Sequence, residues 1–67
     1  MRILVNGENR QVAEGVSLAD ALKELGIGEL RGVGVELDGE FIEREAYGST
    51  PISEGAELAI VRFVGGG

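Results

Sequence analysis

A single stretch of helix-type hydrophobic spacing, set among alternating strands and tight turns, constrains the fold of this chain most. Between residues 17 and 25, apolar side chains recur at the i, i+3, i+4 and i+7 positions of a helix that lies on a core, namely Leu18, Ala21, Leu22 and Leu25. Ser17 is a good N-cap, Asp20 suits the first turn, and Gly26 can take the left-handed position after the last turn. We therefore predict one helix at 17–25, whose apolar face must pack against a sheet.

The remaining segments have the pattern of strands joined by turns. Asn6-Gly7 and Asp38-Gly39 tolerate the positive φ angles that tight hairpin turns demand. The charged residues, Gly, Ser and Thr that precede Pro51 indicate that 43–51 is an irregular connection with one short helical turn. We predict that Tyr47 and Ile52 anchor it. Five strands are predicted, at residues 1–5, 9–13, 33–37, 41–42 and 57–64.

The order of these elements predicts an α+β fold with a single helix packed on one face of a mixed sheet of four to five strands. This is the order of the β-grasp, or ubiquitin-like, fold, in which the first and last strands usually lie side by side in the middle of the sheet. With 67 residues the chain has room for one compact domain. We expect a β-grasp domain at 1–64 and a flexible glycine tail at 65–67.

The composition excludes several classes of function. The sequence has no Cys and no His, which removes thiolate nucleophiles, imidazole bases and the usual zinc ligands. Its carboxylates lack the spacing of a calcium loop, so we predict no catalytic residue and no metal site. A formal charge of −6 disfavours binding to nucleic acid. We see no export signal and no apolar run long enough for a membrane span, and expect a cytoplasmic protein.

The three glycines Gly65, Gly66 and Gly67 stand out once the usual chemistry is excluded. At a background glycine frequency of about 7%, three in a row at the end would occur by chance in roughly three of ten thousand chains. Glycine has no Cβ, so such a segment can enter a channel that side chains would block, and three extended residues span about 10 Å. The tail is suited to delivering a carboxylate into the active site of another protein. A linker remnant or a frayed end is the alternative interpretation.

Segments along the whole sequence match the pattern of a known family. They are Ile3 to Glu8, Ser17 to Leu22, Val33 to Glu40, Glu43 to Glu45, Gly55, and Ile60 to Gly67. Through these segments the sequence resembles the sulfur carriers of the thiamine pathway, the ThiS-like family. The resemblance is moderately specific, and its most specific part is the end. Two positions depart from the pattern, Asp38 where the turn often has Asn and Ala56 where Asp commonly follows the glycine.

The resemblance implies a mechanism in which the chain is a carrier and not an enzyme. A ubiquitin-activating-like adenylyltransferase would use ATP and Mg²⁺ to adenylate the carboxyl group of Gly67. A persulfide sulfur donor would then displace AMP and leave a thiocarboxylate at Gly67. Thiazole synthase would take this sulfur to build the thiazole ring of thiamine. The carrier itself would bind no cofactor.

A docking surface can be predicted from strand alternation. If Leu58 and Ile60 point toward the helix, then Val61 and Phe63 point to the opposite face, together with Leu4 of the neighbouring strand. Exposed apolar patches on small proteins tend to be interfaces, so we predict that Leu4, Val61 and Phe63 contact the partner enzymes. We expect a monomer when the protein is free. The alternative is that a bulge or a dimer buries these side chains.

Three other functions stay open on the sequence alone. Relatives with the same fold and glycine end carry sulfur for molybdopterin, thiolated tRNA or an amino acid. A ubiquitin-like modifier would instead be conjugated to lysines of target proteins. A plain β-grasp interaction domain would have inert glycines, and deleting Gly66 and Gly67 would leave it functional.

Overall fold

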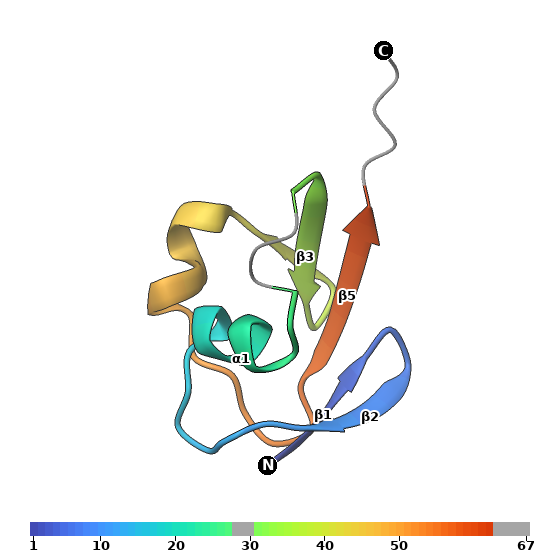
Figure 1. Ribbon diagram of the computed structural model, residues 1–67, viewed down its shortest axis with the longest axis vertical. Helices are drawn as coiled ribbons and strands as arrows, with labels where there is room; N and C mark the ends of the chain where they lie inside the picture. Colours follow the sequence, from blue (N-terminus) through green and yellow to red (C-terminus); the bar gives the residue numbers. More distant parts are fainter. Residues whose placement is uncertain (28–30, 63–67) are drawn as a thin grey trace.

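The computed structural model is one five-stranded sheet with a helix packed against one face (Figure 1). The structure describes residues 1–27 and 31–62. In chain order the elements are β1 (Arg2–Val5), β2 (Glu8–Gln11), α1 (Leu18–Glu24), β3 (Val33–Leu37), β4 (Glu40–Ile42), the 3-10 helix η1 (Arg44–Ser49) and β5 (Glu57–Arg62).

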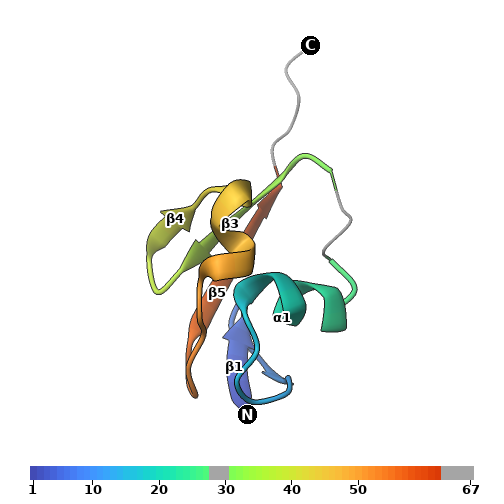
Figure 2. The ribbon, with the colours of Figure 1, turned by 90° about the vertical axis from the view of Figure 1, so that its left-hand side faces the viewer.

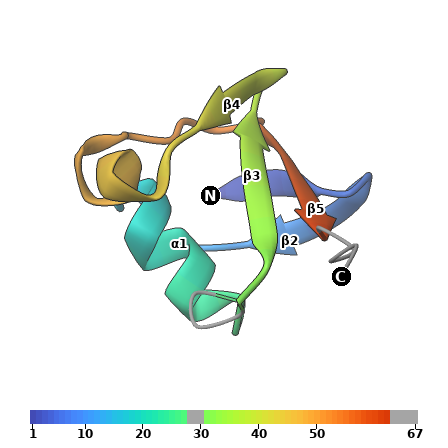
Figure 3. The same cartoon turned by 90° about the horizontal axis from the view of Figure 1, so that it is seen from above.

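The sheet order is β2-β1-β5-β3-β4, which confirms the predicted β-grasp arrangement. Strand β5 runs parallel to β1 and antiparallel to β3, so the first and last strands lie together in the middle. Seen from above, α1 and η1 lie on the same side of the sheet (Figure 3). The other face of the sheet carries no helix in the part of the chain that is described.

Helix α1 is one residue shorter at each end than the predicted range. The Ser17 hydroxyl caps it by accepting a hydrogen bond from the backbone N–H of Asp20, at 3.2 Å. Gly26 follows with a φ of 79°, a conformation that glycine adopts without a steric penalty. The predicted stripe is correct, because Leu18, Ala21 and Leu22 are all buried against the sheet.

The core lies between α1 and the sheet. Its most completely buried side chains are Ile3, Leu18 and Val35, one each from β1, α1 and β3. The connection predicted to contain a short helical turn holds η1, which packs beside α1 (Figure 2). Both of its predicted anchors reach the core, since Ile52 is buried and Tyr47 packs against the buried cluster.

The two hairpin turns also fix the last strand. Asn6 and Asp38 both have a φ of 51°, as the predicted turn dipeptides allow. The side-chain oxygen Oδ1 of Asn6 accepts the N–H of Ile60 at 2.8 Å. Oδ1 of Asp38 accepts the N–H of Glu57 at 2.9 Å. Strand β5 is thus held by both turns in addition to its ladders.

Two strand boundaries differ from the prediction or fall partly outside the described residues. The return strand was predicted at 9–13 but spans Glu8–Gln11. Ala13 leaves the sheet because its backbone N–H donates to a carboxylate oxygen of Glu24 in the helix, at 3.1 Å. The last strand was predicted at 57–64, and its described part ends at Arg62. The proposed boundary between domain and tail at residue 64 lies outside the described residues.

Replacing Asn6 with alanine is expected to lower the free energy of unfolding by about 1–2 kcal/mol. The change leaves the N–H of Ile60 without its side-chain acceptor, and alanine tolerates the positive φ of this position less well than asparagine does. Urea denaturation would measure the loss. Asn6→Gly separates the two causes, because it removes the acceptor while tolerating the turn. Asn9→Ala, at an exposed position of β2, is the control and should change stability by less than about 0.5 kcal/mol. Equal losses at both asparagines would contradict the prediction.

Candidate functional site: an apolar docking face

Strand β5 divides its side chains between the two faces of the sheet. Leu58 is 2% exposed, and Ile60 packs at the margin of the same core. Because successive side chains point to opposite faces, Ala59 and Val61 lie on the face without a helix. The register of β5 against β3 is continuous from Leu58 to Arg62, with no bulge to turn these side chains inward.

Cross-strand neighbours extend this surface on both sides of β5. Leu4 of β1 lies opposite Glu57 on this face, diagonal to Ala59. Phe41 of β4 lies opposite Glu36, which in turn lies opposite Ala59. We call Leu4, Phe41, Ala59 and Val61 the open-face patch. Phe41 is 57% exposed and Val61 43% exposed, which makes them the large exposed hydrophobic residues of the described chain.

Two carboxylates lie within the same surface. Glu36 and Glu57 line a shallow hollow of about 390 Å³ together with Leu4 and Ala59. A partner that offers an apolar side chain beside an arginine or lysine would satisfy both parts of this hollow. Such a mixture of apolar and acidic groups suits contact with another protein.

The sequence-predicted site residues have different outcomes. Leu4 and Val61 lie on one face, as predicted from the alternation of strands. Phe63 and the tail residues Gly65, Gly66 and Gly67 lie outside the described residues. Whether the face binds a partner stays a prediction.

Sequence reasoning missed Phe41 as a surface residue. The signal was present, because a two-residue turn at Asp38-Gly39 places Phe41 opposite Glu36 and so on the face of Glu36. The prediction used Phe41 only to extend the strand.

The described ranges hold neither a candidate metal centre nor an unpartnered buried polar side chain. Residues 1–27 and 31–62 contain no group of three or more acidic, His or Cys side chains that could hold a metal ion. No buried side-chain nitrogen or oxygen in these ranges lacks a hydrogen-bond partner. Among the described helices, none has the length and apolar character required to span a membrane.

Comparison with known proteins decides the family. A model described as the ThiS family matches residues 3–67. The chain belongs to the ThiS family. The match includes the whole open-face patch and runs through the three glycines, so the family pattern covers both features that the sequence singled out.

Solved structures agree with this assignment over the full chain. The crystal structure of the thiamine biosynthesis protein ThiS from Geobacter metallireducens is 36% identical, covers all of both chains and has a TM-score of 0.86. The solution structure of the Geobacter protein has a TM-score of 0.76, over all of this chain and 88% of that one. SAMP1 from Haloferax volcanii, at 23% identity and a TM-score of 0.66 over 98% of this chain and 97% of its own, shows the shared β-grasp fold alone.

A curated relative places the same sequence pattern inside a larger protein. A thiazole synthase from Paramagnetospirillum magneticum (strain ATCC 700264 / AMB-1) is 34% identical over 67 residues. The alignment covers all of this ThiS-family chain but 20% of that relative, so the chain spans about a fifth of its length.

Proposed function

We propose that this chain carries sulfur for thiazole formation in thiamine biosynthesis, as a thiocarboxylate on Gly67. The family match that runs through Gly67 supports this function most directly. The full-length likeness to a thiamine biosynthesis ThiS protein adds to it. A carrier needs a compact body and an accessible reactive end, and the fold provides the body.

The chemistry starts from a carboxylate, which is a poor electrophile. A carboxylate oxygen of Gly67 attacks the α-phosphorus of ATP on the activating enzyme, and pyrophosphate leaves. A persulfide of a partner then attacks the carbonyl carbon and displaces AMP, which forms an acyl disulfide. A thiol cleaves the sulfur–sulfur bond, is itself oxidised to a disulfide with the donor, and releases the thiocarboxylate.

The partners must supply the catalytic groups for every step. The 67 residues contain no Cys to carry a persulfide or to cleave the acyl disulfide, and no His to move a proton. The chain contributes recognition, through its body, and a slim reactive end, since glycine has no side chain to block a narrow channel.

The open-face patch is the surface that we propose for docking. Val61 belongs to β5 and Leu4 to the neighbouring β1, so a partner seated there contacts the strand that precedes the tail in the sequence. The relative in which the homologous segment belongs to a thiazole synthase supports this enzyme as one partner. The adenylating enzyme is the other, and we propose that Phe63 joins the contact with both.

Measuring intact mass tests the proposal directly. The chain is incubated with an adenylating enzyme of this family, ATP, Mg²⁺ and a persulfide donor, and we expect a mass gain equal to the exchange of one oxygen for sulfur. The variant that lacks Gly67 is the control and should show no gain. Isopeptide-linked adducts in place of a thiocarboxylate would indicate a protein modifier. No gain with an enzyme that loads another ThiS protein would refute the carrier function.

A further inference from the structure

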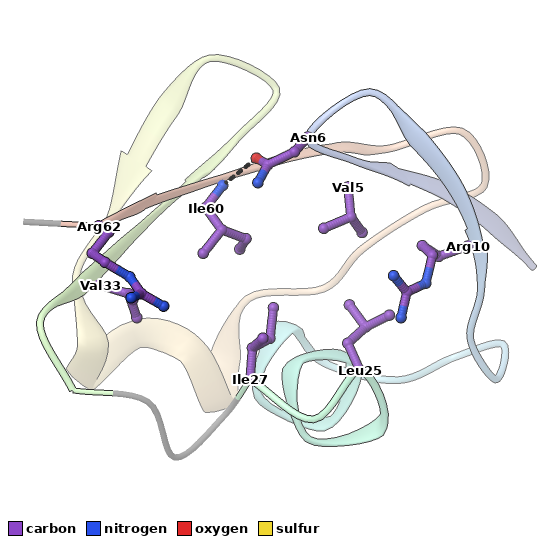
Figure 4. A pocket seen from close by; sticks show the side chains of 8 residues that line it. All are labelled: Val5, Asn6, Arg10, Leu25, Ile27, Val33, Ile60 and Arg62. Atoms are coloured by element: carbon purple, nitrogen blue, oxygen red, sulfur yellow. Dashed lines mark hydrogen bonds between the residues drawn. The ribbon is translucent and has the colours of Figure 1, made fainter.

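A second surface lies at the end of the sheet near the C-terminal end of α1, where residues 1–27 and 31–62 leave a hollow on the helix-side face. Five half-buried apolar side chains line a cavity of about 280 Å³ there (Figure 4). We call this cavity and its rim the β5 notch. Its floor consists of Val5, Leu25, Ile27, Val33 and Ile60, and its polar rim consists of Asn6, Arg10 and Arg62.

An unpaired strand edge borders the notch. Strand β1 pairs with β5 only as far as Val5 opposite Leu58 and then turns away at Asn6, whereas β5 continues to Arg62 (Figure 1). The N–H of Ile60 points to the β1 side, where Oδ1 of Asn6 accepts it. Backbone groups alternate along a strand, so the C=O of Ile60 and the N–H of Arg62 face the same side, past the end of β1. Within the described ranges, neither group has a strand partner there.

The charge at the notch is opposite to that of the molecule. The sequence has six basic residues against twelve acidic ones, yet two of the six line this cavity. The guanidinium groups of Arg10 and Arg62 lie at its two ends, with the apolar side chains between them (Figure 4). Among the described residues, Arg10 forms an ion pair only with Glu8, at 3.9 Å, and the pair is weak because 45% of the Arg10 side chain and 77% of the Glu8 side chain are exposed. In the described part of the chain, Arg62 makes no ion pair.

These observations specify a ligand with three properties. It has an extended backbone, which pairs with the free edge of β5. It has an apolar side chain, which enters the cavity. It also has acidic side chains, which meet Arg10 and Arg62. We propose that the β5 notch binds an extended acidic segment of a partner protein, which adds a short strand to β5 where β1 stops.

This binding mode is separate from docking on the open face. Val5 and Ile60 face the helix side of the sheet, whereas Leu4 and Val61 face the other side. One protein can therefore occupy the open-face patch while an acidic segment occupies the notch. The proposal does not depend on the sulfur-carrier function, and its test needs no activating enzyme.

A designed peptide provides the probe. The peptide GETVTEG, blocked at both ends, places its two Glu and its Val on one face of a strand, because side chains alternate. Titrated into the ¹⁵N-labelled chain, it is expected to shift the amide signals of Asn6, Arg10, Ile60 and Arg62, with a dissociation constant between about 0.1 and 1 mM. The analogue GKTVTKG replaces both Glu with Lys and keeps Thr and Val in place, and it should cause no shifts.

Chain variants and a modified peptide make the test specific. Arg10→Glu combined with Arg62→Glu should weaken binding at least about tenfold, since both attractive charges become repulsive. Arg31→Glu makes the same kind of charge change at an exposed residue outside the notch, and should leave binding within about twofold. A peptide N-methylated at Val and at the Thr that follows it loses one N–H donor on each edge of the strand, and should lose most of its affinity if it binds as a strand.

Several results would overturn the proposal. One is the absence of shifts at about 5 mM peptide, well above the dissociation constant of a weak site. Another is a set of shifts confined to Leu4, Phe41 and Val61, which would place the peptide on the open face. Undiminished binding of the N-methylated peptide would exclude strand addition. Displacement of the peptide by octanoate at equal concentration would identify a pocket for small apolar carboxylates instead.

Discussion

Replacing Val61 with aspartate is expected to leave the domain folded and to lower kcat/KM for adenylation of Gly67 by about a hundredfold, the equivalent of about 2.7 kcal/mol. Val61 is 43% exposed on the open face, so a carboxylate there remains in contact with water in the free protein. In a complex through this face the same carboxylate would be buried against an apolar surface without a partner. The rate of pyrophosphate release by the activating enzyme, measured at several carrier concentrations, gives kcat/KM.

Ser53→Asp is the matched control for this experiment. It adds the same single negative charge at an exposed turn residue outside the patch, and should change kcat/KM by less than about threefold. Phe41→Ala shows whether the contact extends to β4. If Val61→Asp unfolds the domain, the side chain supports the core; if it folds and is adenylated normally, the open-face patch is not the docking surface.

The largest expected effect on stability is that of Leu18→Ala, which should lower the free energy of unfolding by about 3 kcal/mol. Leu18 is completely buried between α1 and the sheet. Alanine is an excellent helix former, so the loss reflects the removed contacts and the cavity and not helix propensity. A domain of this size has roughly 3–10 kcal/mol in total, so the variant should be only marginally folded.

Leu4→Ala removes the same atoms from a half-buried side chain on the open face. It should cost less than about 1 kcal/mol, because less apolar surface leaves contact with the protein. Chemical denaturation of the two variants in parallel gives the comparison. Equal losses would show that Leu4 is as much a core residue as Leu18, which would contradict its assignment to a docking surface.

Local patterns predicted the elements of this fold well. The helix stripe at Leu18 and Leu22 and the cap at Ser17 depend on residues close in sequence, and the structure places them as expected. The turns at Asn6 and Asp38 were also predicted, since few residue pairs tolerate their backbone angles. The pairing of the first and last strands was expected from the order of elements and is confirmed.

Contacts between distant segments could not be predicted in the same way. The side chain of Asn6 accepts a hydrogen bond from the N–H of Ile60, 54 residues away. This contact depends on the sheet register and not on any local pattern. Arg10 and Arg62 line one cavity although they come from opposite ends of the chain, and this too depends on the sheet register. The tail was singled out from composition alone, and its role as the reactive end remains a prediction.

The position of β5 has a mechanical consequence. This strand is bonded on one side to β1 and on the other to β3, and the chain runs from it directly to residues 63–67. When a partner enzyme holds the C-terminal end, a force on that end acts along β5. The force shears the hydrogen bonds to β1 and those to β3 at the same time. Shearing must strain many bonds at once, whereas a hairpin at the edge of a sheet unzips one bond at a time. Because β5 lies in the centre of the sheet, the domain resists unfolding by a force applied at its C-terminal end.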